Sequence, residues 1–265
     1  MARFLPLTFV LLLSAHSANA RFSAGFHDFL THLYGEQVAE QLERPDLNGT
    51  VAFGGGNTSL LWILPNDPIV LVHANKHNAS AEVENAQFFE ANGFQAGSVF
   101  ATSWGPNGTT MSQKETLHCD YVKQVRRLIV AVHLYTQRRV IVGAQSLGSA
   151  VSRKALLGGE CVDTGENLGF PLTSIVRVFF SQHYEAEHVY VVASQTDEAV
   201  TYPYIAIPGA NINISGFSHQ DTQTKTMDIQ LEMINTNHLT NETLQKDVGA
   251  GSELTGKTCT GSVQQ

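Results

Sequence analysis

The sequence has no run of basic residues and, after its first twenty residues, no apolar stretch near the ~20 residues that a membrane-spanning helix needs. Its formal net charge is −8 at pH 7, so the chain as a whole is repelled by polyanions. This balance argues against nucleic acid and anionic membranes as main partners, and it predicts no stable membrane insertion.

The spacings typical of metal sites are also missing. The chain has 11 histidines and 3 cysteines but no Cys-x-x-Cys and no His-Glu-x-x-His. His73 and His77 have the i, i+4 spacing of helical zinc ligands, but they lie in an expected loop with no third ligand nearby. Gly54-Gly55-Gly56 has no following Lys-Ser/Thr, so a phosphate-binding loop is not expected there. We predict neither a metal site nor a cofactor.

Cysteine is scarce, and its count is odd. With Cys119, Cys161 and Cys259, at most one disulfide forms within the chain and one thiol is left over. The sequence does not say which two cysteines pair.

The first twenty residues have the pattern of a secretory signal peptide. Arg3 precedes an apolar run from Phe4 to Leu13, and the small residues Ala18 and Ala20 follow. Asn-x-Ser/Thr sequons are typical of an extracellular chain, and they begin at Asn48, Asn57, Asn78, Asn107, Asn213 and Asn241. We predict a signal peptide over residues 1–20, a single secreted domain over residues 21–265, and an undetermined oligomeric state.

Short apolar runs alternate with segments of helical spacing, which predicts an α/β fold with a mostly parallel sheet and helices on both faces. An amphipathic helix spanning Phe26 to Leu42 opens the domain, and residues 46–59 form a loop. The expected strands are 69–72, 97–102, 140–143, 175–180 and 189–193. The expected helices are 80–91, with Ser80 as N-cap, 115–136 and 147–157.

Ser146 lies where a buried strand runs directly into a helix. Ala144 and Gly148 flank it at two residues on either side, and small residues there let the strand and helix pass close to a strained serine. This is the pattern of a nucleophile elbow. The alternative is a Gly/Ser-rich strand–helix turn without catalysis.

Two backbone N–H groups are candidates for an oxyanion hole. Leu147 begins the helix after the serine, so its N–H points to the site. The second donor is expected from the loop after the first parallel strand, where the sequence reads His73-Ala74-Asn75, and the N–H of Asn75 is the favoured donor. His73 itself also fits a buried histidine that holds the loop by hydrogen bonds.

The acid and the base of a triad follow the nucleophile in this order along such chains. Asp197 comes just after an expected strand and is favoured over its neighbour Glu198. His219, in a turn, is favoured as the base over His238, which ends an apparent helix. The predicted triad is Ser146, Asp197 and His219.

Several segments together resemble the class 2 lipases of the α/β-hydrolase superfamily, especially the nematode branch. They include PIVLVHAN, CDYVKQVRRLIVAVHLYT, GAQSLGSAVSRKALLGGECVDT, LGFPLTSIV, ASQTDEAV and IPGAN, and they span about Phe53 to His238. The resemblance implies an α/β-hydrolase fold, Ser146 as nucleophile, Asp197 and His219 as its partners, and oxyanion donors at Asn75 and Leu147. It further implies hydrolysis of acyl esters by a secreted enzyme without a cofactor.

Three features depart from that family pattern. Ala74 replaces a glycine in the oxyanion turn, and Gln145 precedes the nucleophile where His or Tyr is usual. A segment expected after Phe180 is missing, which removes part of a lid or binding wall and leaves Cys161 without its family partner.

The resulting hypothesis is a secreted lipase or carboxylesterase acting on lipid or other ester substrates. Two alternatives stay open: a secreted glycoprotein that kept the hydrolase fold but acts by binding, and a short-chain carboxylesterase.

Overall fold

The computed structural model describes residues 21–56, 65–106, 116–178, 188–200 and 210–249. Its helices are α1 (Ala24–Tyr34), α2 (Glu36–Glu43), the 3₁₀ helix η1 (Ala79–Glu82), α4 (Val83–Ala91), α5 (Cys119–Thr136), α6 (Leu147–Leu157), α7 (Asp221–Thr224), α8 (Met227–Thr236) and α9 (Asn241–Val248). Its strands are β1 (Ala52–Phe53), β2 (Ile69–Val72), β3 (Val99–Thr102), β4 (Val140–Ala144), β5 (Val176–Val178), β6 (Tyr190–Ser194) and β7 (Ala210–Ile214).

The main sheet has five strands in the order β1-β3-β2-β4-β5. β2 pairs in parallel with β3 and β4, β4 pairs in parallel with β5, and only β1 runs antiparallel to its neighbour in this sheet. The predicted α/β fold with a mostly parallel sheet is therefore confirmed. Strands β6 and β7, however, pair in parallel as a separate two-stranded sheet within the described residues.

The main sheet is apolar on both faces, because helices cover both. Val70, Val72 and Val142 lie in one core cluster with residues of α1, α5 and α6. Ile69, Leu71 and Ile141 alternate with them and pack on the other face against α4 and α8. This alternation of side chains between two covered faces explains why the strands are continuous apolar runs.

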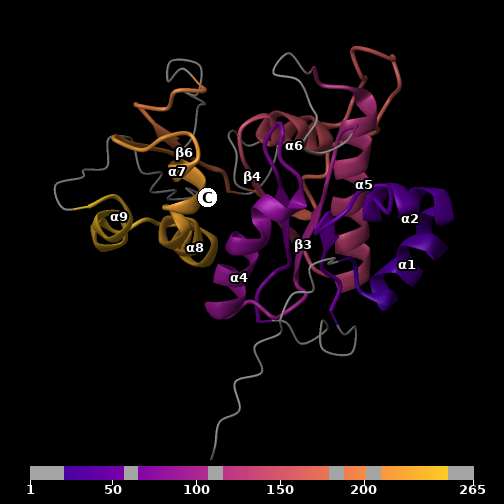
Figure 1. Cartoon of the computed structure of the whole chain (residues 1–265), viewed down its shortest axis with the longest axis horizontal. Coiled ribbons are helices and arrows are strands. Elements are labelled where there is room, and N and C mark those ends of the chain that lie inside the picture. Colours follow the sequence, from indigo (N-terminus) through magenta and orange to yellow (C-terminus); the bar gives the residue numbers. More distant parts are fainter. Residues whose placement is uncertain (1–20, 57–64, 107–115, 179–187, 201–209, 250–265) are drawn as a thin grey trace, which may run out of the picture.

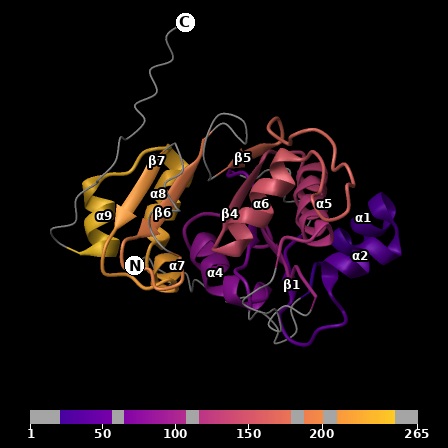
Figure 2. The ribbon, with the colours of Figure 1, turned by 90° about the horizontal axis from the view of Figure 1, so that it is seen from above.

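Helix α8 connects the two sheets. Ile234 belongs to the core cluster of the main sheet, whereas Ile229 and Met233 pack with Ile212 and Ile214 of β7. Figure 2 shows β6, β7 and α7 to α9 gathered on one side of β4, with α1 and α2 at the opposite end. The C-terminal elements thus reach the main sheet through a helix that packs in both directions.

The expected and observed elements differ where single residues redirect the backbone. The opening helix is interrupted by Gly35, whose φ of 86° is unfavourable for other residues, so α1 and α2 are separate. Asn78, rather than Ser80, caps the helical segment after β2, since its side chain accepts from the Ser80 N–H. The short strand β1 lies within a segment expected to be a loop.

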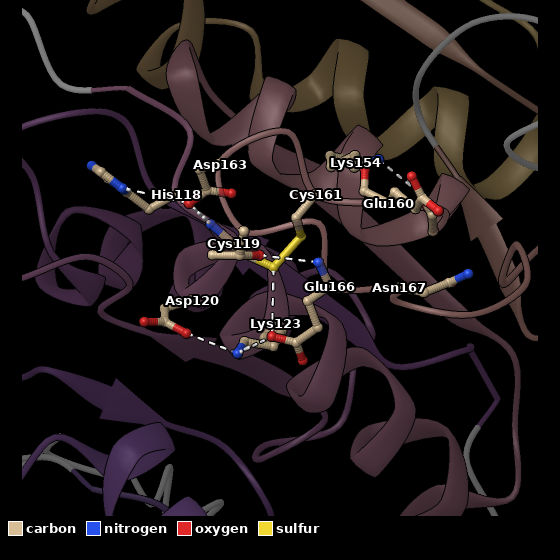
Figure 3. Close-up of a disulfide and its surroundings, with 12 residues drawn as sticks. His118, Cys119, Asp120, Lys123, Lys154, Glu160, Cys161, Asp163, Glu166 and Asn167 are labelled. Atoms are coloured by element: carbon tan, nitrogen blue, oxygen red, sulfur yellow. Dashed lines mark hydrogen bonds and ion pairs between the residues drawn. A yellow bond between two sulfur atoms is a disulfide. The ribbon is translucent and has the colours of Figure 1, made fainter.

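A disulfide joins Cys119, at the start of α5, to Cys161, in the loop after α6. The expectation that Cys161 lacks a partner is therefore wrong. In Figure 3 the bridge lies among charged side chains of this loop and of α5, where Lys123 forms ion pairs with Asp120 and Glu166. Cys259 lies outside the described residues.

Several predictions fall outside the described residues: the signal peptide over residues 1–20, the sequons at Asn57 and Asn107, and the segment directly after Phe180. Among the helices that are described, none is both long and apolar enough to span a membrane. Asn48 and Asn241 are exposed, and Asn78 is half-buried.

Candidate functional site

Ser146 lies in the short connection between β4 and α6, two elements that Figure 1 shows next to each other. Its φ of 54° and ψ of −127° place a residue with a side chain in a backbone region that such residues rarely adopt. The turn is held on both sides, because the Gln145 N–H donates to the carbonyl of Val72 and the Ser149 N–H donates to the carbonyl of Ser146. The surrounding backbone thus imposes the strain at Ser146, which is typical of functional sites.

Gly148 allows α6 to begin directly against the end of β2. A Cβ atom at this position would lie 2.4 Å from the carbonyl oxygen of His73 and 2.5 Å from that of Val72. The first turn of α6 therefore lies against the predicted oxyanion loop. Leu147 is the first residue of the helix, so its N–H has no acceptor one turn earlier in the helix and is available to the site.

His73 and Trp104 fix the loop that follows β2. The Trp104 backbone N–H donates to Nε2 of His73 at 3.1 Å, so the ring proton is on Nδ1, which donates to the carbonyl of Ala74 at 2.7 Å. The Trp104 indole N–H donates to the carbonyl of His73, and the two rings stack. Burial lowers the pKa of His73 to about 3, which keeps the ring neutral.

These contacts also set the direction of the Asn75 N–H. The carbonyl of Ala74 accepts from the His73 ring and from the backbone N–H of His77. Because the peptide unit is planar and trans, the Asn75 N–H points away from that carbonyl. Ala74 is not among the residues with positive φ, so its Cβ adds no left-handed strain at the position where the family carries glycine.

Asp197 and His219 are brought together after β6 and β7. Nδ1 of His219 lies 2.7 Å from a carboxylate oxygen of Asp197. The other carboxylate oxygen accepts the backbone N–H groups of Ala199 and Val200, both at 2.8 Å. Burial acts to raise the pKa of Asp197, but these hydrogen bonds from His219, Val200 and Ala199 outweigh it and hold the pKa below its usual value.

Glu198, the competing acid, contacts the backbone of His219 instead of its ring. Its carboxylate accepts the His219 N–H at 3.0 Å. The turn is closed further by Ser218 and Asp221, since the side chain of each accepts the backbone N–H of the other. His238, the competing base, is exposed beyond the end of α8.

Gln145 links the turn of Ser146 to the turn of His219. In the sequence it was noted only as a departure from the family pattern. The side-chain amide of Gln145 donates to the carbonyl of His219 at 3.3 Å. Within the described residues Ser146 and His219 themselves are not hydrogen-bonded. Gln145 is therefore a direct polar contact between the two segments.

His77 is a second residue near the site whose place the sequence did not show. Burial, with a smaller contribution from the nearby His219, lowers the pKa of His77. Its Nδ1 is buried and has no hydrogen-bond partner among the described residues. In the sequence, His77 stands out only by its spacing from His73. Its proximity to His219 could not be predicted, because the two residues lie more than a hundred positions apart in the chain.

Two further features of the described residues lie apart from the predicted site residues. A cavity of about 410 Å³ lies between α2 and the start of α5, lined in part by Arg44, Tyr121 and Gln124, and it contains none of the predicted site residues. A group of two cysteines and Asp163 has metal-ligand spacing, but its sulfurs are those of the disulfide.

A family model for class 2 lipases matches residues 66–183, which include Asn75, Ser146 and Leu147 and end before Asp197. No curated protein matches the chain. Among solved structures, an alpha-beta serine hydrolase homologue from Coxiella burnetii is similar at 12% identity over 71% of this chain and 90% of its own, with a TM-score of 0.42. A serine hydrolase without a lid from Xanthomonas campestris is similar at 13% identity over 64% of this chain and 81% of its own, with a TM-score of 0.41.

Proposed function

We propose that the chain is a secreted serine hydrolase that cleaves acyl esters, in keeping with the match of its residues 66–183 to the class 2 lipase model. The observation that carries this proposal is the strained backbone of Ser146 at a strand–helix turn. Support comes from the hydrogen-bonded pair of Asp197 and His219. Both features are those of a Ser-Asp-His triad.

In the proposed reaction His219 removes the proton of the Ser146 hydroxyl as its oxygen attacks the ester carbonyl. The N–H groups of Asn75 and Leu147 stabilise the oxyanion. His219 then gives its proton to the leaving alcohol, and the acyl group stays on Ser146. A water molecule, deprotonated by His219, releases the carboxylic acid and restores the serine. Asp197 keeps Nδ1 protonated and stabilises the imidazolium throughout.

The test is reaction with a fluorophosphonate probe combined with ester hydrolysis. The wild type should be labelled at Ser146, and Ser146→Ala should lose labelling and about 10⁴- to 10⁶-fold in kcat. Ser149→Ala is the matched control, because Ser149 lies one turn along α6 and its hydroxyl is bonded to the carbonyl of Ala144. Hydrolysis that survives in Ser146→Ala would refute the assignment.

The same experiment separates the enzyme from a binding protein that kept the fold. A folded wild-type protein without labelling would favour binding. The absence of left-handed strain at Ala74 supports the enzyme, since the alanine at this position was one of the two departures, with the missing segment after Phe180, that favoured a binding protein. Rates on emulsified and on soluble esters then distinguish a lipase from a short-chain carboxylesterase.

Secretion is part of this proposal and has its own test. Removal of the signal peptide should give a protein whose N-terminal sequence starts at Arg21. Exposed sequons at Asn48 and Asn241 should carry glycans, and treatment with an N-glycosidase should lower the apparent mass. Retention of the full-length chain inside the producing cells would contradict secretion.

A further inference from the structure

Glu82, at the end of η1, is a buried carboxylate without a cationic partner in the described part of the chain. Its exposed fraction is 3%. Two neutral amides face it: the Gln223 amide from α7, 2.9 Å from both carboxylate oxygens, and the Asn85 amide from α4, at 3.3 Å. Burial outweighs these bonds and raises the pKa of Glu82 to about 7.

The short helix η1, which carries Glu82, is held in place by hydrogen bonds at its start. The N–H of Ala79, which starts η1, donates to the hydroxyl of Ser103, and this hydroxyl donates to the carbonyl of Val51. Asn78 caps the same short helix. Glu82 therefore belongs to the segment that directly follows the oxyanion loop and is attached to the main sheet.

Gln223 connects Glu82 to the turn that contains His219 through hydrogen bonds to both segments. Its side-chain oxygen accepts the amide of Gln220 at 3.2 Å, which directs its own amide nitrogen toward Glu82. Its backbone N–H donates to the carbonyl of Gln220. Gln220 is the residue directly after His219, so a line of hydrogen bonds runs from Glu82 through Gln223 to the backbone beside His219.

We propose that Glu82 is a positioning residue: its carboxylate, through Gln223 and Gln220, holds His219 in register with the serine turn. This inference rests on the proposed function, since it gives a role to the base of that triad. A buried carboxylate facing only amides costs stability, because desolvation is not offset by an opposite charge. Its contribution is then to geometry: hydrogen bonds to a charged group are stronger and more directional than neutral ones.

The kinetic test uses a charge-removing variant and its exchange partner. Activity is measured above pH 7, where Glu82 is charged. In Glu82→Gln, an amide faces the Gln223 amide whose orientation Gln220 fixes, and kcat should fall about tenfold with KM little changed. The double variant Glu82→Gln with Gln223→Glu places the carboxylate on the other side of the same pair and should restore most of kcat. Glu84→Gln, an exposed change of the same charge two residues away, should match the wild type.

Two kinetic results would overturn the inference. One is a Glu82→Gln enzyme as active as Glu84→Gln. The other is an exchanged pair that is no more active than the single variant, because the carboxylate–amide pair would then not be what places His219.

A second measurement does not depend on catalysis. The proton between Nδ1 of His219 and Asp197 should give a low-field NMR resonance that is absent in His219→Gln. Its exchange with water should be faster in Glu82→Gln and return toward the wild-type rate in the exchanged pair. Gln220→Ala, an exposed change that leaves the buried carboxylate in place, should also speed the exchange, and it serves if Glu82→Gln does not fold. Unchanged exchange in these variants overturns the positioning role, whereas a wild type without hydrolysis but with the expected exchange pattern refutes only the proposed function.

Stability separates positioning from an ordinary structural role. The pKa of Glu82 is raised by folding, so the folded chain holds a proton that the unfolded chain releases, and the free energy of unfolding falls as pH rises from about 4.5 toward about 7. Glu82→Gln should remove this fall and be no less stable than the wild type above pH 7. A loss of kcat without a loss of stability is the expected result; equal losses of both would show that Glu82 only supports the fold.

Discussion

The two halves of the candidate site are held in different ways. On the serine side, the backbone itself determines the geometry. Ser146 has a strained backbone conformation, and the N–H of the preceding residue donates to the end of β2. Gly148 lets α6 begin directly against the same strand. On the histidine side, three side chains hold His219 by hydrogen bonds. Asp197 accepts from its ring, Glu198 accepts from its backbone N–H, and Gln145 donates to its backbone carbonyl. The first arrangement depends on close backbone contacts between α6 and the end of β2, and the second depends on hydrogen bonds from three side chains.

This contrast predicts that a single polar substitution on the histidine side can be nearly as harmful as loss of the nucleophile. Asp197→Asn should lower kcat by about 10⁴-fold, because an amide can stabilise the wrong tautomer of His219 and cannot stabilise the imidazolium. Steady-state hydrolysis across pH measures this, with Glu198→Gln as the comparison at the neighbouring position. A similar loss in both variants would mean that the two carboxylates share the role.

On the serine side, activity should instead be sensitive to the volume of the side chain at position 148. In Gly148→Ala the new Cβ would meet the carbonyl oxygens of His73 and Val72, so α6 or the oxyanion loop has to shift, and kcat should fall about a hundredfold. Gly25→Ala is the matched control, since Gly25 also lies in a helix and its Cβ would meet only the hydroxyl of Tyr135 at 3.3 Å. Full activity in Gly148→Ala would show that the close approach is not required.

Glu198→Gln should cause a smaller loss, about threefold to tenfold in kcat. The bond to the His219 N–H becomes neutral and is worth about 1 kcal/mol less, while the ring contact with Asp197 is unchanged. The decrease should be in kcat with a constant KM. A loss as large as that of Asp197→Asn would place Glu198 in the triad.

Removal of the disulfide should affect activity least. Its ring encloses a sequence separation of 42 residues, for which chain entropy gives about 4 kcal/mol of stabilisation. Replacing both Cys119 and Cys161 by Ser should lower the unfolding free energy by up to that amount in denaturant titrations, with kcat within about twofold of the wild type at low temperature. A large drop in kcat would connect this loop to the site.

The same contrast explains what the sequence could predict. Strand β2 and helix α6 have the predicted bounds, because their signals, an apolar run and a serine between small residues, lie within a few neighbouring residues. The family model covers this same part of the chain and ends before Asp197. The pairing of Asp197 with His219 was predicted from chain order, from the place of Asp197 just after an expected strand and of His219 in a turn, and from the family resemblance. The structure brings the two side chains together.

The contacts of Gln145, Glu198 and Glu82 could not be predicted from the sequence. Each is a polar side chain whose partner lies between 21 and 141 residues away, and no periodicity or motif encodes such a pairing. The split of the opening helix at Gly35 and the two-residue strand β1 were missed for a related reason. A single glycine in a helical pattern is often tolerated, and so short a strand is defined by its pairing with β3 rather than by its own residues.

The disulfide has a practical consequence for limited proteolysis. The segment between Cys119 and Cys161 contains Ser146, and its turn between α5 and β4 exposes Gln137 and Arg139 beside Arg138. A trypsin cut after Arg138 would divide the chain, yet the two pieces would stay covalently joined. Electrophoresis without reductant would show a single band of full mass, and reductant would release the C-terminal piece that carries the serine.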